Sequence, residues 1–135
     1  MIVVDTSIAV AAALPWHEAH AAARSALERS KTRAIGQVAA ETYSVLTRLP
    51  PPQRVPPSVA RDYLVEMFEL PPIVLEPEEY ARLLDLAVAE HVGGGAVYDA
   101  IVATTARSAG ATLLTLDQRA LRTYQLVGAA YTLVT

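Results

Sequence analysis

Four acidic residues in this 135-residue chain occupy positions where a carboxylate suggests chemistry: Asp5, Glu41, Asp99 and Asp117. Asp5 and Asp117 each follow a short apolar run of the kind that forms a buried strand. In open parallel sheets, ligands bind beyond the carboxyl ends of the strands. For each of these two residues, N-capping of the following helix is the alternative explanation. Two strands that each deliver an Asp to the same sheet edge nevertheless favour a site there.

The other two acids lie on apolar faces of predicted helices. Asp99 is the only charged residue between positions 96 and 106, and the side chains that share its helix face are small and apolar. Glu41 lies on the inward apolar stripe of its own helix. Burying an unpaired carboxylate costs several kcal/mol, so a purely structural role needs a partner. Arg107 is the candidate partner for Asp99, and Arg48 is the candidate for Glu41.

If the four acids meet in one pocket, only a bound cation makes their mutual repulsion tolerable. Hard divalent ions prefer carboxylate oxygens, and Mg²⁺ is typically held by few carboxylates plus water, which leaves positions for phosphate oxygens. Mn²⁺ is the usual substitute, because oxygen ligands suit both ions. The pattern therefore predicts a Mg²⁺ site, open to Mn²⁺, with Asp5, Glu41, Asp99 and Asp117 as its ligands.

Strands and helices alternate along the chain, which predicts an α/β fold with a mostly parallel sheet covered on both faces. Prolines and glycines mark the boundaries, and Pro50 begins a loop that ends at Pro57. Strands are expected at 1–4, 33–36, 73–75, 111–116 and 130–134. Helices are expected at 5–14, 17–30 and 38–49, from a cap at Ser58 to before Pro71, at 77–91 and 96–109, and for a short stretch after Asp117.

The length of the chain fits one domain over residues 1–135. There are no cysteines, which excludes thiolate metal sites and cysteine nucleophiles and is compatible with a reducing cytoplasm. No signal peptide and no membrane span are expected, so the predicted location is cytoplasmic. The formal net charge of −3 does not by itself suggest a nucleic-acid binder, but acids that are neutralised by metal weaken that objection.

Four segments resemble the motifs of PIN-domain nucleases, in the order and spacing of the VapC-type toxins of type II toxin–antitoxin pairs. The resemblance covers essentially the whole chain, and each of the four acids stands where the family has one. The segments are IVVDTS at 2–7, AETYSVLTRL at 40–49, YDAIVA at 98–103 and LLTLDQR at 113–119.

The resemblance implies a three-layer α/β/α fold and a Mg²⁺- or Mn²⁺-dependent endoribonuclease. It also implies a homodimer and inhibition by a cognate antitoxin protein. In this interpretation the four carboxylates are both the catalytic residues and the metal ligands. A metal-activated water attacks phosphorus in line and leaves a 5′-phosphate, so no protein nucleophile is needed.

Five further residues are weaker candidates, each with a structural alternative. Thr115 could orient a carboxylate or a water, or it could be an ordinary strand residue. Ser7 and Thr6 could do the same, or could cap the first helix. Arg48 and Arg119 could hold RNA phosphates, or could form solvent-facing salt bridges.

Other functions fit less well. A phosphatase-like α/β enzyme of the haloacid-dehalogenase type would have a second Asp two residues after the first, where this chain has Ser7. A receiver domain would have adjacent acids near its start and a late lysine, whereas the sole lysine is Lys31. The remaining alternative is a non-catalytic PIN-like scaffold that binds RNA or protein without cutting. The four intact acids favour the nuclease.

Overall fold

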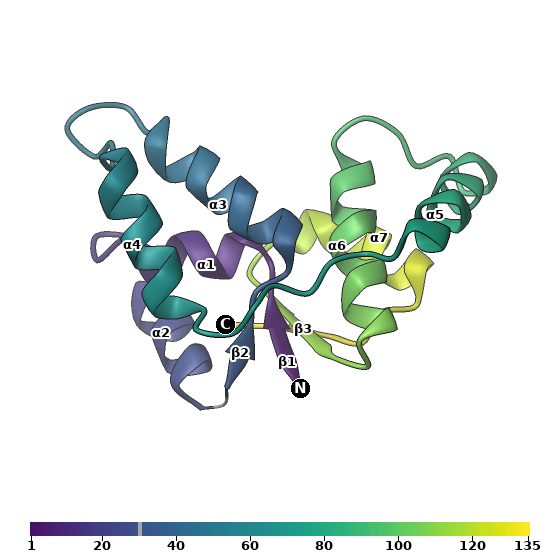
Figure 1. Cartoon of the computed structure of the whole chain (residues 1–135), viewed down its shortest axis with the longest axis horizontal. Coiled ribbons are helices and arrows are strands. Elements are labelled where there is room, and N and C mark those ends of the chain that lie inside the picture. The colour runs from purple at the N-terminus through teal and green to yellow at the C-terminus, as the bar shows by residue number, and fades with distance from the viewer. Residues whose placement is uncertain (30) are drawn as a thin grey trace.

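The strands form a parallel sheet at the centre of the molecule (Figure 1). The computed structural model describes residues 1–29 and 31–135. Its strands are β1 (Ile2–Val4), β2 (Thr32–Arg33), β3 (Thr112–Thr115) and β4 (Tyr131–Leu133), in the order β2-β1-β3-β4. All neighbouring pairs are parallel, so the chain must cross back over the sheet between them. The predicted α/β class with a mostly parallel sheet is confirmed.

The helices form a layer on each side of the sheet. Figure 1 shows α1 to α4 gathered on one side and α5 to α7 on the other, which confirms the three-layer α/β/α arrangement. Among the described residues, no helix combines the length and the apolar character that a membrane span requires. The bounds are α1 (Thr6–Ala13), α2 (His20–Glu28), α3 (Gly36–Thr47), α4 (Pro57–Met67), α5 (Pro77–Ala89), α6 (Ala96–Ser108), the 3₁₀ turn η1 (Gln118–Ala120) and α7 (Leu121–Val127).

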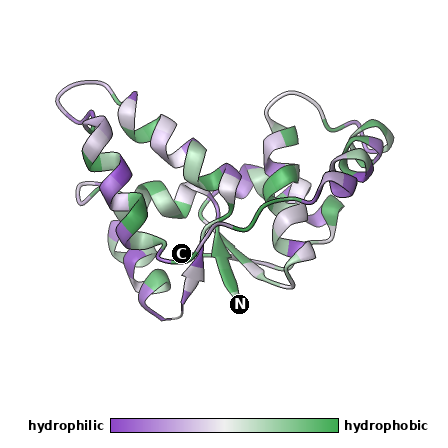
Figure 2. Cartoon of the chain, in the orientation of Figure 1, coloured by the Kyte–Doolittle hydropathy of each residue, from purple (hydrophilic) through white to green (hydrophobic). Residues whose placement is uncertain are grey.

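The core lies between the sheet and these two layers. Val3, Val4 and Leu113 of the central strands are fully buried, and β1 is hydrophobic along its length (Figure 2). Ile8 of α1 and Ala103 of α6 are equally inaccessible to solvent. Burial from both sides explains why the central strands have continuous apolar runs rather than an alternating pattern. The strand ends that carry Asp5 and Asp117 therefore have a rigid base.

The predicted strand at 73–75 is wrong. Ile73 makes only an isolated parallel bridge with Ile35, and Val74 is exposed. The Ile73 N–H donates to Ala34 O, and the Gly36 N–H donates to Ile73 O, both at 2.8 Å. Two prolines directly precede this segment and have no N–H to extend the ladder, so the pairing stops after one residue.

Three element boundaries also differ from the prediction. The strand expected at 33–36 is β2 at Thr32–Arg33, and Gly36 already opens α3. Ser58 does not cap α4: Pro56 is the N-cap and Pro57 occupies the first helical position, where its missing N–H has no cost. The helix expected to begin at His17 begins at His20, and its predicted end, Ser30, lies outside the described residues.

Candidate active site

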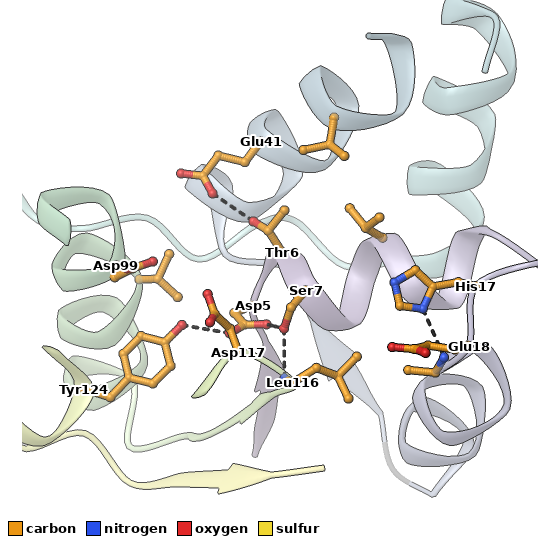
Figure 3. Close-up of a pocket in the computed structure, with 14 residues that line it drawn as sticks. Asp5, Thr6, Ser7, His17, Glu18, Glu41, Asp99, Leu116, Asp117 and Tyr124 are labelled. Carbon is orange, nitrogen blue, oxygen red and sulfur yellow. Dashed lines mark hydrogen bonds between the residues drawn. The ribbon is translucent and has the colours of Figure 1, made fainter. Parts of the chain in front are cut away.

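The four predicted carboxylates line one pocket with a volume of about 580 Å³ (Figure 3). Asp5 connects β1 to α1, and Asp117 connects β3 to η1. Glu41 comes from α3 and Asp99 from the first turn of α6. The pocket thus opens at the carboxyl ends of the two central strands, where a ligand site of a parallel sheet is expected. The packing of α3 against α6 brings the two helical acids to the same place.

Asp5 is both a helix cap and a wall of the pocket. Its side chain is buried, and Oδ1 accepts hydrogen bonds from the Ile8 N–H at 3.3 Å and from the Ser7 hydroxyl. Oδ2 accepts from the Tyr124 hydroxyl at 2.8 Å. The capping explanation for Asp5 is therefore correct but incomplete, because the carboxylate also faces the pocket.

Asp117 has the same double role. Its Oδ1 accepts from the Arg119 N–H at 2.9 Å and so caps η1, while the carboxylate lines the pocket. The Thr115 hydroxyl accepts from the Asp117 N–H at 2.9 Å, which holds the backbone at the strand end. The Ser7 hydroxyl accepts from the Leu116 N–H at 2.9 Å. Ser7 therefore ties the start of α1, and with it Asp5, to the end of β3.

Glu41 is oriented by neutral donors. The Thr6 hydroxyl donates to Oε2 at 2.9 Å, and the Gln37 amide donates to Oε1 at 2.7 Å. Both oxygens are therefore hydrogen-bonded while the charge of the carboxylate is left uncompensated. Thr6 and Ser7 thus each donate a hydrogen bond to a carboxylate of the pocket, and their part in the chemistry stays a prediction.

The structural salt bridges considered for the helical acids are not formed. Arg48 donates to the Ser44 hydroxyl at 2.9 Å instead of reaching Glu41. Arg107 donates to Val127 O at 3.1 Å, away from Asp99. The ion pairs within residues 1–29 and 31–135 are Arg61 with Asp62 and Arg82 with Glu79, none of which involves the pocket. Its negative charge therefore has no cationic partner in the described chain.

Burial and the neighbouring negative charges together raise the pKa of Asp99 from 3.8 to about 6. Burial is the largest cause, followed by repulsion from Asp117, Glu41 and Asp5. Burial also raises the pKa of Asp5, against the opposing effect of hydrogen bonds from Ser7, Thr115, Tyr124 and the Ile8 N–H. Asp99 and Asp5 are therefore both harder to ionise in the metal-free pocket. A bound cation would reverse this preference, because it stabilises the charged carboxylates.

The donor set fits a hard divalent cation: four carboxylates, no thiolate, and no protein counter-charge among the described side chains. In that same part of the chain, no group of three or more ligand side chains is already close enough together to hold an ion. Mg²⁺ does not need such a cage, since it is commonly held by one or two carboxylates plus water and phosphate oxygens.

Three polar residues of the pocket were not identified from the sequence as part of this site: Tyr124, His17 and Glu18. Tyr124 is almost completely buried on α7, and its hydroxyl needs a partner there. The spacing of Thr123, Tyr124 and Val127 indicates the inward side of α7, but it does not distinguish Tyr124 from an ordinary core residue. The two arginines considered for phosphate contact, Arg48 and Arg119, have exposed side chains and do not line the pocket.

Comparison with known proteins agrees with this geometry. The family model described as PIN domain matches residues 2–126. The chain belongs to the PIN-domain family. It is 46% identical, over all 135 residues and the full length of the relative, to Ribonuclease VapC40 of two Mycobacterium tuberculosis strains, CDC 1551 / Oshkosh and ATCC 25618 / H37Rv. It is 39% identical to Ribonuclease VapC27 of the latter strain over 127 residues, which are 94% of this chain and 92% of that protein. The resemblance to VapC-type PIN proteins is confirmed.

The raised pKa of Asp99 predicts a pH-dependent stability of the metal-free protein. Between pH 3.8 and about 6, the folded state holds more protons on Asp99 than the unfolded state does, so stability falls as pH rises through this window. Asp99→Asn should remove this pH-dependent loss of stability, because asparagine does not ionise. In EDTA, the variant should gain on the order of 1–2 kcal/mol over wild type between pH 4 and pH 7, after allowance for solvent screening.

Denaturant unfolding at several pH values measures this difference. Asp85→Asn is the matched control, because Asp85 is exposed on α5 and does not line the pocket. A difference between Asp99→Asn and wild type that does not change with pH would contradict the proposed electrostatic coupling.

Removing the Tyr124 hydroxyl should weaken the orientation of Asp5. Tyr124→Phe keeps the packing of the ring but removes the 2.8 Å hydrogen bond to Asp5 Oδ2. Because a buried acceptor is left unsatisfied, we expect a loss of about 1–3 kcal/mol in the free energy of unfolding. Mg²⁺ affinity, measured from metal-dependent melting, should change as well. Tyr131→Phe is a control, since the Tyr131 hydroxyl accepts only from the exposed Gln125 amide. If Mg²⁺ raises the melting temperature of both variants equally, Tyr124 is only a core residue and does not orient Asp5 for metal binding.

Proposed function

We propose that this PIN-domain protein is a metal-dependent endoribonuclease that hydrolyses RNA phosphodiester bonds as the toxin of a toxin–antitoxin pair. The observation that carries this proposal is the pocket that Asp5, Glu41, Asp99 and Asp117 line without a cationic partner in the described chain. The relatives named ribonucleases, matched over essentially the whole chain, support RNA as the substrate.

The side chains divide the work between binding and orientation. The four carboxylates would hold Mg²⁺, or Mn²⁺ in its place. When bound, such an ion supplies Lewis-acid stabilisation of phosphate oxygens and makes a water more acidic. Thr6 and Gln37 fix the orientation of the Glu41 carboxylate. Their hydroxyl and amide groups need not move during the reaction, which lowers the cost of reorganisation.

A non-catalytic PIN-like scaffold is the second candidate. Such a protein would have no reason to keep four unneutralised acids in a pocket, because they destabilise the metal-free fold. The raised pKa of Asp99 supports this argument, since burial and then repulsion from the other three acids oppose its ionisation.

We also propose two protein partners, a second copy of the chain in a homodimer and a cognate antitoxin. Exposed apolar side chains support both partners, because they occur on two separate surfaces. On α5, Tyr80, Leu84 and Val88 follow one another at four-residue spacing, with exposed fractions of 46%, 56% and 79%. Between α3 and α4, a groove of about 400 Å³ is lined in part by Tyr43 and Val65. Figure 1 places α4 and α5 at opposite ends of the molecule. A cytoplasmic location stays a prediction from the sequence.

The nuclease proposal predicts that RNA cleavage needs both metal and Asp99. Purified protein should cut RNA with Mg²⁺ or Mn²⁺ and stop in EDTA. Asp99→Asn should reduce the rate by at least a hundredfold, because it removes one of the charges that would bind the ion. Asp85→Asn, the exposed control on α5, should retain the wild-type rate. Cleavage by Asp99→Asn at the wild-type rate, after repurification to exclude a contaminating nuclease, would disprove the assignment.

The toxin proposal predicts a growth phenotype. Expression of the chain alone should slow the growth of a bacterial host, and co-expression of the neighbouring small gene should relieve the effect. Asp99→Asn should be harmless at the same protein level, since it lacks the cleavage activity. Growth rate and the amount of soluble protein are measured together. Wild-type protein that accumulates in folded form without slowing growth would count against a toxin role.

A further inference from the structure

The pocket extends well beyond the four carboxylates. Its far end is formed by His17 and Glu18, in the turn between α1 and α2. Figure 3 shows these two side chains on the opposite side of the pocket from Asp99 and Tyr124. The 580 Å³ pocket therefore reaches beyond the carboxylates and includes this second end, where another part of a substrate can lie.

His17 presents a fixed hydrogen-bond donor to this end of the pocket. Its Nδ1 accepts from the Ala19 N–H at 3.0 Å, so in the neutral ring the hydrogen is carried by Nε2. The His17 N–H donates to Leu14 O at 2.9 Å, and His17 O accepts from the His20 N–H at 3.0 Å. These two hydrogen bonds fix the backbone of the turn before and after His17. Figure 3 shows the second ring nitrogen turned toward the hollow.

Glu18 presents two acceptor oxygens beside this donor. Its carboxylate points toward the same hollow (Figure 3), and its side chain is exposed. Within the described part of the chain, the Glu18 carboxylate has no hydrogen-bond or ion-pair partner. The negative charge of Glu18, which adds to that of the four carboxylates, would repel an RNA phosphate at this end of the pocket. The combination of one donor and two acceptors is instead suited to the polar edge of a base.

We propose that His17 and Glu18 form a subsite that binds an unpaired guanine base of the RNA substrate. This proposal rests on the nuclease function and adds a base preference to it. Val10 and Val45 also line the pocket and give it apolar surface for a base. Bases of single-stranded RNA are typically recognised in this way, with apolar contact to the ring and hydrogen bonds to the Watson–Crick edge.

Guanine is the base whose edge matches these groups. Its Watson–Crick edge offers one acceptor, O6, followed by two donors, N1–H and the N2 amino group. His17 Nε2–H can donate to O6, and the two oxygens of Glu18 can accept from N1–H and N2–H. Adenine and cytosine each offer only one donor group on this edge, and uracil places its donor between two acceptors. Each of them would leave Glu18 partly unsatisfied.

The base preference can be measured in cleavage. We expect wild-type protein with Mg²⁺ to cut a randomised single-stranded RNA pool with guanine enriched at one fixed position relative to the cut bond. Inosine at that position lacks the N2 amino group, and should raise KM about tenfold with little change in kcat. Glu18→Gln should raise KM for the guanine RNA to a similar extent and should respond much less to inosine. Glu90→Gln, an exposed acid at the end of α5, should behave like wild type.

A second measurement does not depend on nuclease activity. Trp16 is the sole tryptophan of the chain, and its ring centroid lies 6.3 Å from that of His17. Its fluorescence should therefore report on occupancy of the subsite. The probes are the trinucleotides UGU, UIU and UAU, titrated with Ca²⁺ in place of Mg²⁺. We expect UGU to bind about tenfold more tightly than the other two, and Glu18→Gln to lose this preference.

The two measurements separate the failure of each proposal. Cleavage without a guanine preference, or with one that Glu18→Gln does not alter, would overturn the subsite and leave the nuclease intact. Absence of cleavage together with a guanine-selective change in Trp16 fluorescence would overturn the nuclease and support the subsite. Equal binding of the three trinucleotides would overturn the subsite whatever the cleavage result.

Discussion

Electrostatic repulsion among four carboxylates is the constraint on which this structure depends. Two of them are placed at strand ends and two on helices, so no local segment can hold them together. Only a rigid sheet with a helical layer on each side fixes all four around one hollow. Burial and this repulsion together raise the pKa of Asp99, and we therefore expect the metal-free fold to be less stable than its core would allow.

Neutral donors hold the carboxylates in place. Hydroxyl groups of Thr6, Ser7 and Tyr124 each donate to one of the acids, and the Gln37 amide donates to Glu41. Arginines at the same positions would bind more strongly but would cancel the charge that attracts a cation. The network therefore orients the acids and preserves the negative potential of the pocket. The opposite end, at His17 and Glu18, differs in character because it can match a base edge instead of an ion.

The four acids could be predicted from the sequence because each departs from the pattern around it. Asp5 and Asp117 end apolar runs, and Asp99 and Glu41 interrupt apolar helix faces. Tyr124 could not be identified in the same way, because a tyrosine on the inward side of a helix has the same pattern as an ordinary core residue. Its contact with Asp5 joins residues that are 119 positions apart, which local spacing cannot reveal. The late start of α2 was missed for a local reason: the His17 ring accepts the Ala19 N–H and keeps the turn out of the helix.

The hydrogen bond between Tyr124 and Asp5 has a consequence for protein synthesis. Asp5 is made more than a hundred residues before Asp117 and Tyr124. On the ribosome, domains generally fold as units while the chain emerges at about 5–20 residues per second. A growing chain therefore cannot assemble this pocket until α7 has emerged and packed against α6. A copy that stops before Asp117 would have three of the acids, but neither the second strand-end carboxylate nor the Tyr124 hydroxyl that orients Asp5. The site is therefore completed only at a late stage of synthesis.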